Sequence, residues 1–293
     1  MTKVNMDLVK QLRDKTQVGM MDCKKALEET EGDFDKACEI LRKKGAAVAA
    51  KRADNVTNHG RIESFISPDF KTGALVEVAC ETDFSANTEA MKHFVDNVAQ
   101  QVALGNPADI NALMAQPLAT NPQSSARHLL DELVAKICES IKVNRFVRFA
   151  VSGNGLVNAY IHPGSTVGVL IELTTDKDAS AHLDALKTIA KDVCMQIAVT
   201  NPLCTQSDEL DQTIIEKERE IAREQLKDSG KPAQVIDKIV EGKLNKFFQE
   251  VCLLSQGFIK NDKQTVAQYI DESSKKLGLT IKVKQFKRFA IGR

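Results

Sequence analysis

Several features that mark particular protein classes are scarce in this 293-residue sequence. It has no tryptophan and two tyrosines, so stacking platforms for sugars or unpaired bases would have to come from its twelve phenylalanines. Its 40 basic residues balance 40 acidic residues, and a chain without net charge exerts no long-range attraction on phosphate. We therefore expect no direct nucleic-acid partner.

Long apolar segments are missing as well. Asp7 lies where a signal peptide needs an unbroken apolar stretch. Charged residues interrupt every run that approaches the roughly eighteen apolar residues needed to cross a bilayer. The remaining composition, 43% hydrophobic and 27% charged, is typical of a globular protein. We expect a cytoplasmic protein with no membrane partner.

Cysteine usage gives no sign of a disulfide framework or a metal site. The sequence has seven cysteines and no Cys-x-x-Cys pair, and an odd number cannot all pair within one chain. The five histidines lack the spacing of metal ligands. We interpret most cysteines as buried small hydrophobic residues in a reducing compartment, and we expect no metal and no cofactor.

Familiar catalytic motifs are also missing. The sequence contains no phosphate-binding Gly-x-x-x-x-Gly-Lys-Ser/Thr loop, no dinucleotide fingerprint, no Gly-x-Ser-x-Gly elbow and no His-Glu-x-x-His helix. Its histidines are scattered, and a lone histidine is more often a surface or core residue than a catalyst. We expect no enzyme of covalent chemistry, with a hydrolase or transferase as the most remote alternative.

What the sequence does contain is an internal repeat. Three pairs of similar segments are offset by 95 positions: 60–66 with 155–161, 73–78 with 168–173, and 98–107 with 193–202. A fourth pair, 141–151 with 281–291, is offset by 140, so the second copy carries 45 additional residues. The repeat divides the chain into segments 60–152 and 153–293.

Each copy is predicted to fold as two short strands, two helices and a last strand. In the first copy, Ile62 to Ile66 and Leu75 to Cys80 are β-branched runs bounded by turn residues. The helix that follows places Met91, Phe94, Val95, Val98 and Val102 on one face and ends at Asn-Pro. Strict alternation in the last strand would place Ile141, Val143, Arg145, Val147 and Phe149 on one side. The fold class is therefore α+β, with two related three-stranded antiparallel sheets and helices packed on them.

The additional residues of the second copy are assigned to 208–251. This charged segment carries two apolar stripes that could bury each other as an antiparallel helical hairpin or short coiled coil. The predicted stripes are Leu210, Ile214, Ile221 and Leu226 against Ile236, Ile239, Val240, Leu244, Phe247 and Phe248. The hairpin is either a solvated projection or a contact arm for another protein.

Residues 1–45 are predicted to form a separate three-helix module, followed by a linker over 46–59. Apolar residues recur at helical spacing without strand signals, Asp33 is the expected N-cap of the third helix, and Gly45 its expected end. So small a core favours a docking module over a structural support. The loop from Thr16 to Met21 is the best candidate for an exposed apolar patch.

One short stretch fits none of these elements simply. Glu77 to Phe84 ends a strand and turns toward a helix, with Thr82 and Asp83 as caps and Phe84 beside a charge. Phe84 lies seven residues before Met91, so the residues alone favour Phe84 as the first core residue of that helix. The alternative is a functional aromatic residue at the end of an element.

The sequence resembles the translation elongation factor Ts family from end to end. Two motifs carry the resemblance: Leu12-Arg-Asp-Lys-Thr16 followed by Met20-Met-Asp-Cys-Lys-Lys-Ala-Leu27, and Glu77-Val-Ala-Cys-Glu-Thr-Asp-Phe-Ser-Ala-Asn87. The hairpin segments Glu216-Lys-Glu-Arg, Ser229-Gly-Lys-Pro and Ile239 to Phe247 are typical of bacterial members. The family fold implies a ubiquitin-associated-like (UBA-like) N-terminal domain, two related core subdomains and a helical hairpin.

The resemblance implies a guanine-nucleotide exchange factor that binds elongation factor Tu in its GDP-bound and nucleotide-free forms. Thr82, Asp83, Phe84 and Ser85 would then disturb the magnesium site of that partner, and His162 would lie in a further contact region. The N-terminal module would grip the partner through Leu12, Arg13, Thr16, Met20, Met21, Asp22 and Lys24. The hairpin would contact the partner or a second copy of this chain, as in a homodimer within a heterotetramer.

The sequence departs from the family pattern at three positions. Gln17 replaces a usual glycine in the docking loop, Ser85 replaces the usual valine after Phe84, and Gly257 replaces a frequent proline. We interpret Ser85 as weakening an apolar wedge at Phe84. The competing interpretation of the whole chain is a scaffold whose UBA-like module binds peptides without any effect on a nucleotide.

Overall fold

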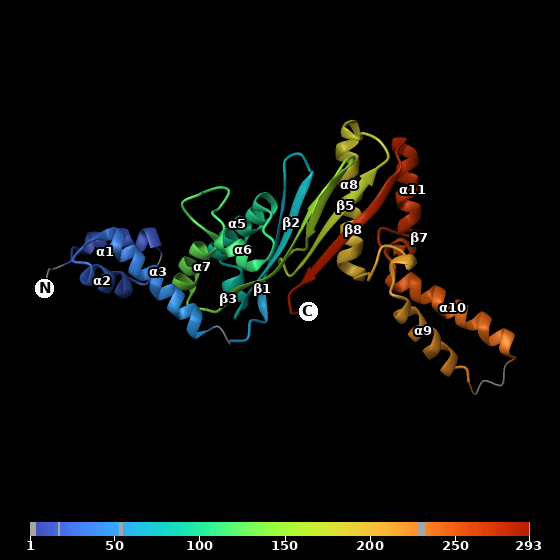
Figure 1. The fold of residues 1–293 in the computed structure, drawn as a ribbon, viewed down its shortest axis with the longest axis horizontal. Coiled ribbons are helices and arrows are strands. Elements are labelled where there is room, and N and C mark those ends of the chain that lie inside the picture. The colour runs from blue at the N-terminus through green and yellow to red at the C-terminus, as the bar shows by residue number, and fades with distance from the viewer. Residues whose placement is uncertain (1–3, 17, 53–54, 228–231, 293) are drawn as a thin grey trace.

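The computed structural model describes residues 4–16, 18–52, 55–227 and 232–292. These residues form an elongated molecule with a helical module at the N-terminal end, two sheets in the middle and a helical hairpin at the far end (Figure 1). The predicted α+β class, with N-terminal helices before small antiparallel sheets, is confirmed. None of the helices described here is long and apolar enough to cross a membrane.

Three helices form the N-terminal module: α1 (Met6–Thr16), α2 (Met20–Glu29) and α3 (Phe34–Lys51). They enclose a small core in which Leu12 and Leu27 are fully buried. Asp33 caps α3 as predicted, because its Oδ1 accepts the N–H of Lys36 at 3.1 Å. The predicted helix end at Gly45 is wrong, since α3 continues to Lys51.

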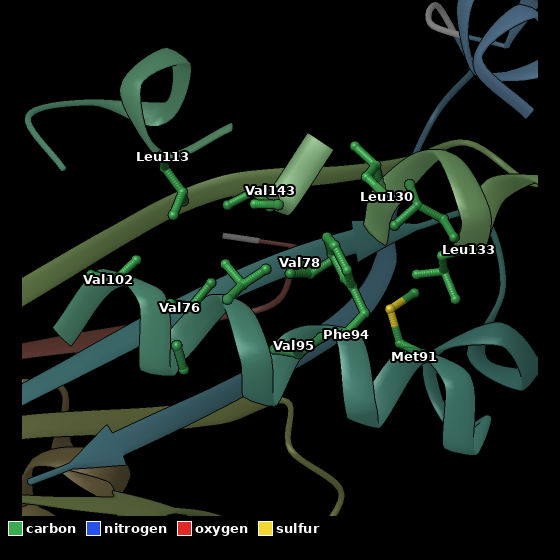
Figure 2. Close-up of a cluster of buried hydrophobic side chains, with 14 of the residues drawn as sticks. Val76, Val78, Met91, Phe94, Val95, Val102, Leu113, Leu130, Leu133 and Val143 are labelled. Carbon is green, nitrogen blue, oxygen red and sulfur yellow. The ribbon is translucent and has the colours of Figure 1, made fainter. Parts of the chain in front are cut away.

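The first copy of the repeat is a three-stranded antiparallel sheet covered on one face by helices. Its strands β1 (His59–Ile66), β2 (Thr72–Cys80) and β3 (Ile141–Ala150) pair in the order β1-β2-β3. Between β2 and β3 the chain forms α4 (Asp83–Ala86), α5 (Glu89–Gly105), α6 (Ile110–Ala115) and α7 (Ala126–Ile137). All five apolar residues predicted for the core face of α5 are buried, and Figure 2 shows four of them against β2 and α7.

The second copy repeats this plan. Its strands β4 (Gly155–Ile161), β5 (Val167–Thr175) and β8 (Ile281–Ala290) pair in the order β4-β5-β8, with α8 (Leu183–Thr200) and α11 (Val266–Leu277) packed on them. A short hairpin, β6 (Gly257–Phe258) and β7 (Asn261–Thr265), precedes α11. Asn106 and Asn201 end α5 and α8 in the same left-handed conformation, 95 positions apart. The predicted repeat is confirmed down to its helix caps.

The last strand of the first copy departs from the predicted alternation. The pairing of β2 with β3 shifts between Glu77 and Val78, which leaves Asn144 as an additional, bulged residue. Ile141 and Val143 therefore face the same core as Phe146, whereas Val147 and Phe149 face the opposite side. A bulge reverses the side-chain alternation beyond it, so the prediction of one continuous face was wrong.

The two sheets pack face to face. Contacts between them occur in pairs, in which the two copies have reversed roles. Ile62, Leu75, Val157 and Leu170 are fully buried in the shared core. The N–H of Ile62 donates to the carbonyl of Ser165, and the N–H of Val157 donates to the carbonyl of Phe70, each at 2.7 Å. Because each contact has its counterpart 95 positions away, the copies are related by an approximate two-fold axis.

The hairpin consists of α9 (Gln212–Glu224) and α10 (Ala233–Val251). Of the turn predicted at Ser229 to Pro232, all but Pro232 lies outside the described residues. Both helices fall inside the predicted insertion, but one stripe differs from the prediction. Ile214 and Ile221 are 40% and 42% exposed, whereas Ile215 and Ala222 are buried. Ile215 and Ala222 pack in one cluster with Val240 and Leu244 of α10, so this face of α9 points inward.

Candidate functional site

The turn that follows β2 presents an aromatic side chain to solvent. Phe84 lies in α4 and is 83% exposed, which is the highest exposure among the large hydrophobic residues described. The interpretation of Phe84 as the first core residue of α5 is therefore wrong. The α5 core begins at Met91, and the intervening residues form a separate turn of helix.

The backbone of this turn is held from both ends. The Thr82 side chain accepts the N–H of Ser85 at 3.2 Å, so Thr82 is the N-cap of α4 as predicted. The Asn87 side-chain amide donates to the carbonyl of Asp83 at 2.9 Å. Ser85 is only 5% exposed, so it supports the turn from inside and does not form part of the exposed wedge surface.

Two glutamates connect the turn to neighbouring elements. Glu139, just after α7, accepts the Thr82 N–H at 3.1 Å and the Thr82 hydroxyl at 2.8 Å. Glu81 accepts the Ser140 N–H at 2.6 Å and an Arg52 N–H at 3.1 Å. These donors, with the backbone N–H of Ser140 first, lower the pKa of Glu81 below its usual value. The turn is thus connected by hydrogen bonds to the segment after α7 and to the chain after α3.

This arrangement is better suited to binding another protein than to catalysing a covalent reaction. An exposed aromatic ring beside the carboxylate of Asp83 can enter an apolar cleft near charged groups of a partner. Within the described ranges, no group of three histidine, cysteine, aspartate or glutamate side chains could hold a metal ion. The seven cysteines, all of which lie in described positions, are free thiols.

The residues predicted for N-terminal docking are only partly on the surface. Met21 is 64% exposed and Arg13 is also exposed, so both could contact a partner. Leu12 is fully buried, and the Thr16 hydroxyl donates to the Leu12 carbonyl at 2.7 Å. Gln17 lies outside the described residues.

The other predicted docking residues of the module make local contacts. Met20 packs at the edge of the module core. The Asp22 carboxylate accepts a hydrogen bond from the Lys44 ammonium, and the Lys24 ammonium lies 3.7 Å from a Glu28 carboxylate oxygen. These charged pairs are at the surface and contribute little to stability.

His162 is exposed in the turn between β4 and β5. Its Nδ1 lies 3.0 Å from the Tyr160 hydroxyl, and the two rings are in edge contact with centroids 6.0 Å apart. Gly257, the third departure from the family pattern, begins β6, where an added Cβ would meet no atom within 4 Å. The candidate residues therefore occupy three places: the turn at Phe84, the N-terminal module and the turn at His162.

Sequence reasoning missed the supports of the Phe84 turn. Glu139 and Arg52 belong to no motif, and their contacts with Thr82 and Glu81 join positions 57 and 29 residues apart. One signal was available for Glu81, because the repeat aligns it with Asp176. The Asp176 carboxylate accepts the Thr280 N–H at 2.8 Å, as Glu81 accepts that of Ser140.

Comparisons with known proteins show the family to which the sequence is similar. Residues 81–293 match the sequence model of the family described as elongation factor TS. The chain is 44% identical over 284 residues to an elongation factor Ts of Clostridium perfringens, and 41% identical over 284 residues to that of Trichlorobacter lovleyi. Each comparison covers 97% of this chain and 91% of the relative. The elongation factor Ts of Clostridium novyi is 39% identical over 289 residues, which cover 99% of this chain and 93% of the relative.

Proposed function

Because this chain belongs to the elongation factor Ts family and is a translation elongation factor, we propose that it is a guanine-nucleotide exchange factor for elongation factor Tu. It binds the GDP-bound partner, promotes GDP release and holds the nucleotide-free form. The observation that carries this proposal is the 83% exposed Phe84 on a turn braced by Thr82 and Glu139. The activity belongs in the cytoplasm, where elongation takes place.

The proposed mechanism moves a metal without any covalent step. In a GDP-bound GTPase, magnesium and backbone donors share the charge of the phosphate oxygens, and magnesium demands nearly ideal octahedral geometry. A ring inserted between elements beside that site shifts the ligands and so weakens the hold on the ion and on GDP. No nucleophile, resident metal or cofactor of this chain takes part.

Energy considerations require several contacts to act together. A rate gain of about 10⁴ corresponds to roughly 5.5 kcal/mol of stabilisation in the transition state for release. Burial of one phenylalanine side chain contributes about 1.5–3 kcal/mol. The N-terminal module, through exposed residues such as Met21 and Arg13, and the turn at His162 are the proposed sources of the remainder.

The test is to compare Phe84→Ala with the wild-type chain in stopped-flow release of a fluorescent GDP from elongation factor Tu. At saturating factor, we expect Phe84→Ala to slow release by about tenfold to a hundredfold, since about 1.5–3 kcal/mol of apolar burial is lost from the transition state. The matched control is Leu104→Ala, which removes a 50% exposed apolar side chain near the C-terminal end of α5, away from the Phe84 turn. Equal rates for Phe84→Ala and wild type would rule out the wedge and favour a scaffold that leaves the nucleotide untouched.

A further inference from the structure

Corresponding residues of the two copies can be compared to distinguish residues that the fold requires from residues that serve a function. α7 and α11 start and end 140 positions apart, and each ends at a left-handed residue, Cys138 with φ 59° and Gly278 with φ 62°. The carboxylates of Glu81 and Asp176 accept equivalent backbone N–H groups, as described above. Features present in both copies belong to the fold that the copies share.

The residue after each of these helix ends differs between the copies. In the first copy it is Glu139, whereas the second copy has Leu279, which is 6% exposed and packs in the core. The position of Phe84 corresponds to Ala179, which is 7% exposed and also faces the core. The glutamate thus occurs in the copy with the exposed aromatic residue, whereas the second copy packs a leucine at the same position.

Both carboxylate oxygens of Glu139 accept hydrogen bonds from Thr82, the first residue of the turn. One carboxylate oxygen accepts the Thr82 N–H and the other accepts the Thr82 hydroxyl. The same hydroxyl oxygen accepts the Ser85 N–H at 3.2 Å, on the residue that follows Phe84. A four-residue helix is unstable by itself, so its conformation depends on such external supports.

We propose that Glu139 is a positioning residue that locks the Thr82–Ser85 turn and so presents Phe84 to the partner GTPase in a single orientation. It acts by lowering the entropic cost of ordering the turn on binding. Hydrogen bonds to a charged group are the stronger kind, which suits this role. This inference rests on the proposed function, because it assigns Glu139 a task in the action of Phe84.

The first test measures the turn itself, without the partner. We compare amide hydrogen exchange at Thr82 and Ser85 in the wild-type chain and in Glu139→Leu, which installs the residue of the second copy. Exchange at both amides should be about tenfold faster in Glu139→Leu, with the protection of the β2 amides unchanged. Unchanged exchange at Thr82 and Ser85 would overturn the proposal whatever the activity.

The second test measures nucleotide release as a function of factor concentration. Glu139→Leu should lower the maximal rate about tenfold, whereas Glu139→Gln, which keeps an acceptor for the Thr82 hydroxyl, should lose about twofold to threefold. In the Phe84→Ala background, Glu139→Leu should cause no further loss, because the two residues act as one unit. Glu272→Leu on α11 is the control for a glutamate-to-leucine change at an exposed site.

The outcomes separate the two proposals. If Phe84→Ala slows release but Glu139→Leu does not, or if the two losses add, Glu139 is no positioning residue and the wedge remains. If Phe84→Ala leaves release unchanged, the wedge role of Phe84 fails as well. If the wild-type chain does not accelerate GDP release at all, the proposed function itself fails. A cooperative thermal transition for each variant, close to that of wild type, excludes general unfolding as the cause of a loss.

Discussion

Phe84 remains in solvent because its neighbours, not its own side chain, determine the turn. Burial of a phenylalanine side chain stabilises a protein by about 1.5–3 kcal/mol, and the free chain lacks this stabilisation at Phe84. Thr82 and Ser85 instead fix the backbone, and Ser85 occupies the inward position. The same apolar area is then available for burial against a partner. Hydrophobic spacing alone could not predict this, because it placed Phe84 in the core.

The buried thiol of Cys80, beside this turn, predicts a dependence of stability on pH. Burial, followed by the nearby charge of Glu139, raises the pKa of Cys80 from 9.0 to about 11. Between these values the unfolded chain releases the thiol proton while the folded chain retains it. The contribution of Cys80 to stability is therefore present below pH 9 and is lost as the pH rises toward 11.

Thermal unfolding from pH 8 to pH 11 would measure this effect. We expect the midpoint of the wild-type chain to fall more steeply over this range than that of Cys80→Ala, because the variant has no thiol to titrate. Cys80→Ala should start lower, since it leaves a small cavity. Parallel curves for the two proteins would show that the thiol does not titrate differently on unfolding.

The repeat and the turn signals predicted the positions of the helices and strands better than the alternation of side chains predicted which faces are buried. Gly and Asn-Pro signals located the strands and the end of α5. The bulge at Asn144 and the exposed face of α9 escaped prediction, since both depend on contacts with another element. Glu77 accepts hydrogen bonds from Asn144 and Arg145 at the bulge, a pairing across 67 and 68 positions.

The contact between the two sheets predicts an intolerance of side chains at two glycines. An added Cβ would lie 2.6 Å from Val157 Cγ1 at Gly73, and 2.5 Å from Ile62 Cγ2 at Gly168. Gly73→Ala and Gly168→Ala should each lower the free energy of unfolding by about 1–3 kcal/mol, measured by urea denaturation. Gly242→Ala in α10, where a Cβ meets nothing within 4 Å, should raise it by up to about 1 kcal/mol. A destabilisation equal at all three positions would refute a specific sheet contact.

The attachment of the N-terminal module depends on a third glycine. A Cβ at Gly45 would lie 2.2 Å from the Asp131 carbonyl oxygen and 2.8 Å from Ala135 Cβ, so α3 and α7 pack closely there. Gly45→Ala should push α3 away from α7 and expose the chain around Arg52 to trypsin. We expect cleavage at least several-fold faster than in wild type. Digestion at the wild-type rate would mean that α7 accommodates the added methyl group without separating from α3.

In the molecule as a whole, duplication has produced one scaffold with two different faces. The copies pack as reciprocal halves, yet the first presents Phe84 to solvent where the second buries Ala179. The N-terminal module and the hairpin project at opposite ends of the scaffold (Figure 1), which suits contacts with separate surfaces of a partner. The domain boundaries, the docking set in the module and a homodimer within a heterotetramer stay predictions.

The proposed action also sets a thermodynamic condition on the whole molecule. An exchange factor and a nucleotide that weaken each other's binding do so reciprocally, so the factor must bind nucleotide-free elongation factor Tu more tightly than the GDP-bound form. A coupling of 1–3 kcal/mol, the usual order for such linkage, corresponds to about 5-fold to 150-fold in affinity.

Isothermal titration calorimetry of this chain against elongation factor Tu, with and without saturating GDP and magnesium, measures that condition directly. The account predicts a dissociation constant at least about fivefold lower for the nucleotide-free partner. It also predicts a smaller ratio for Phe84→Ala, with residual coupling from the remaining contacts. Equal affinities of the wild-type chain for the two forms would contradict the account.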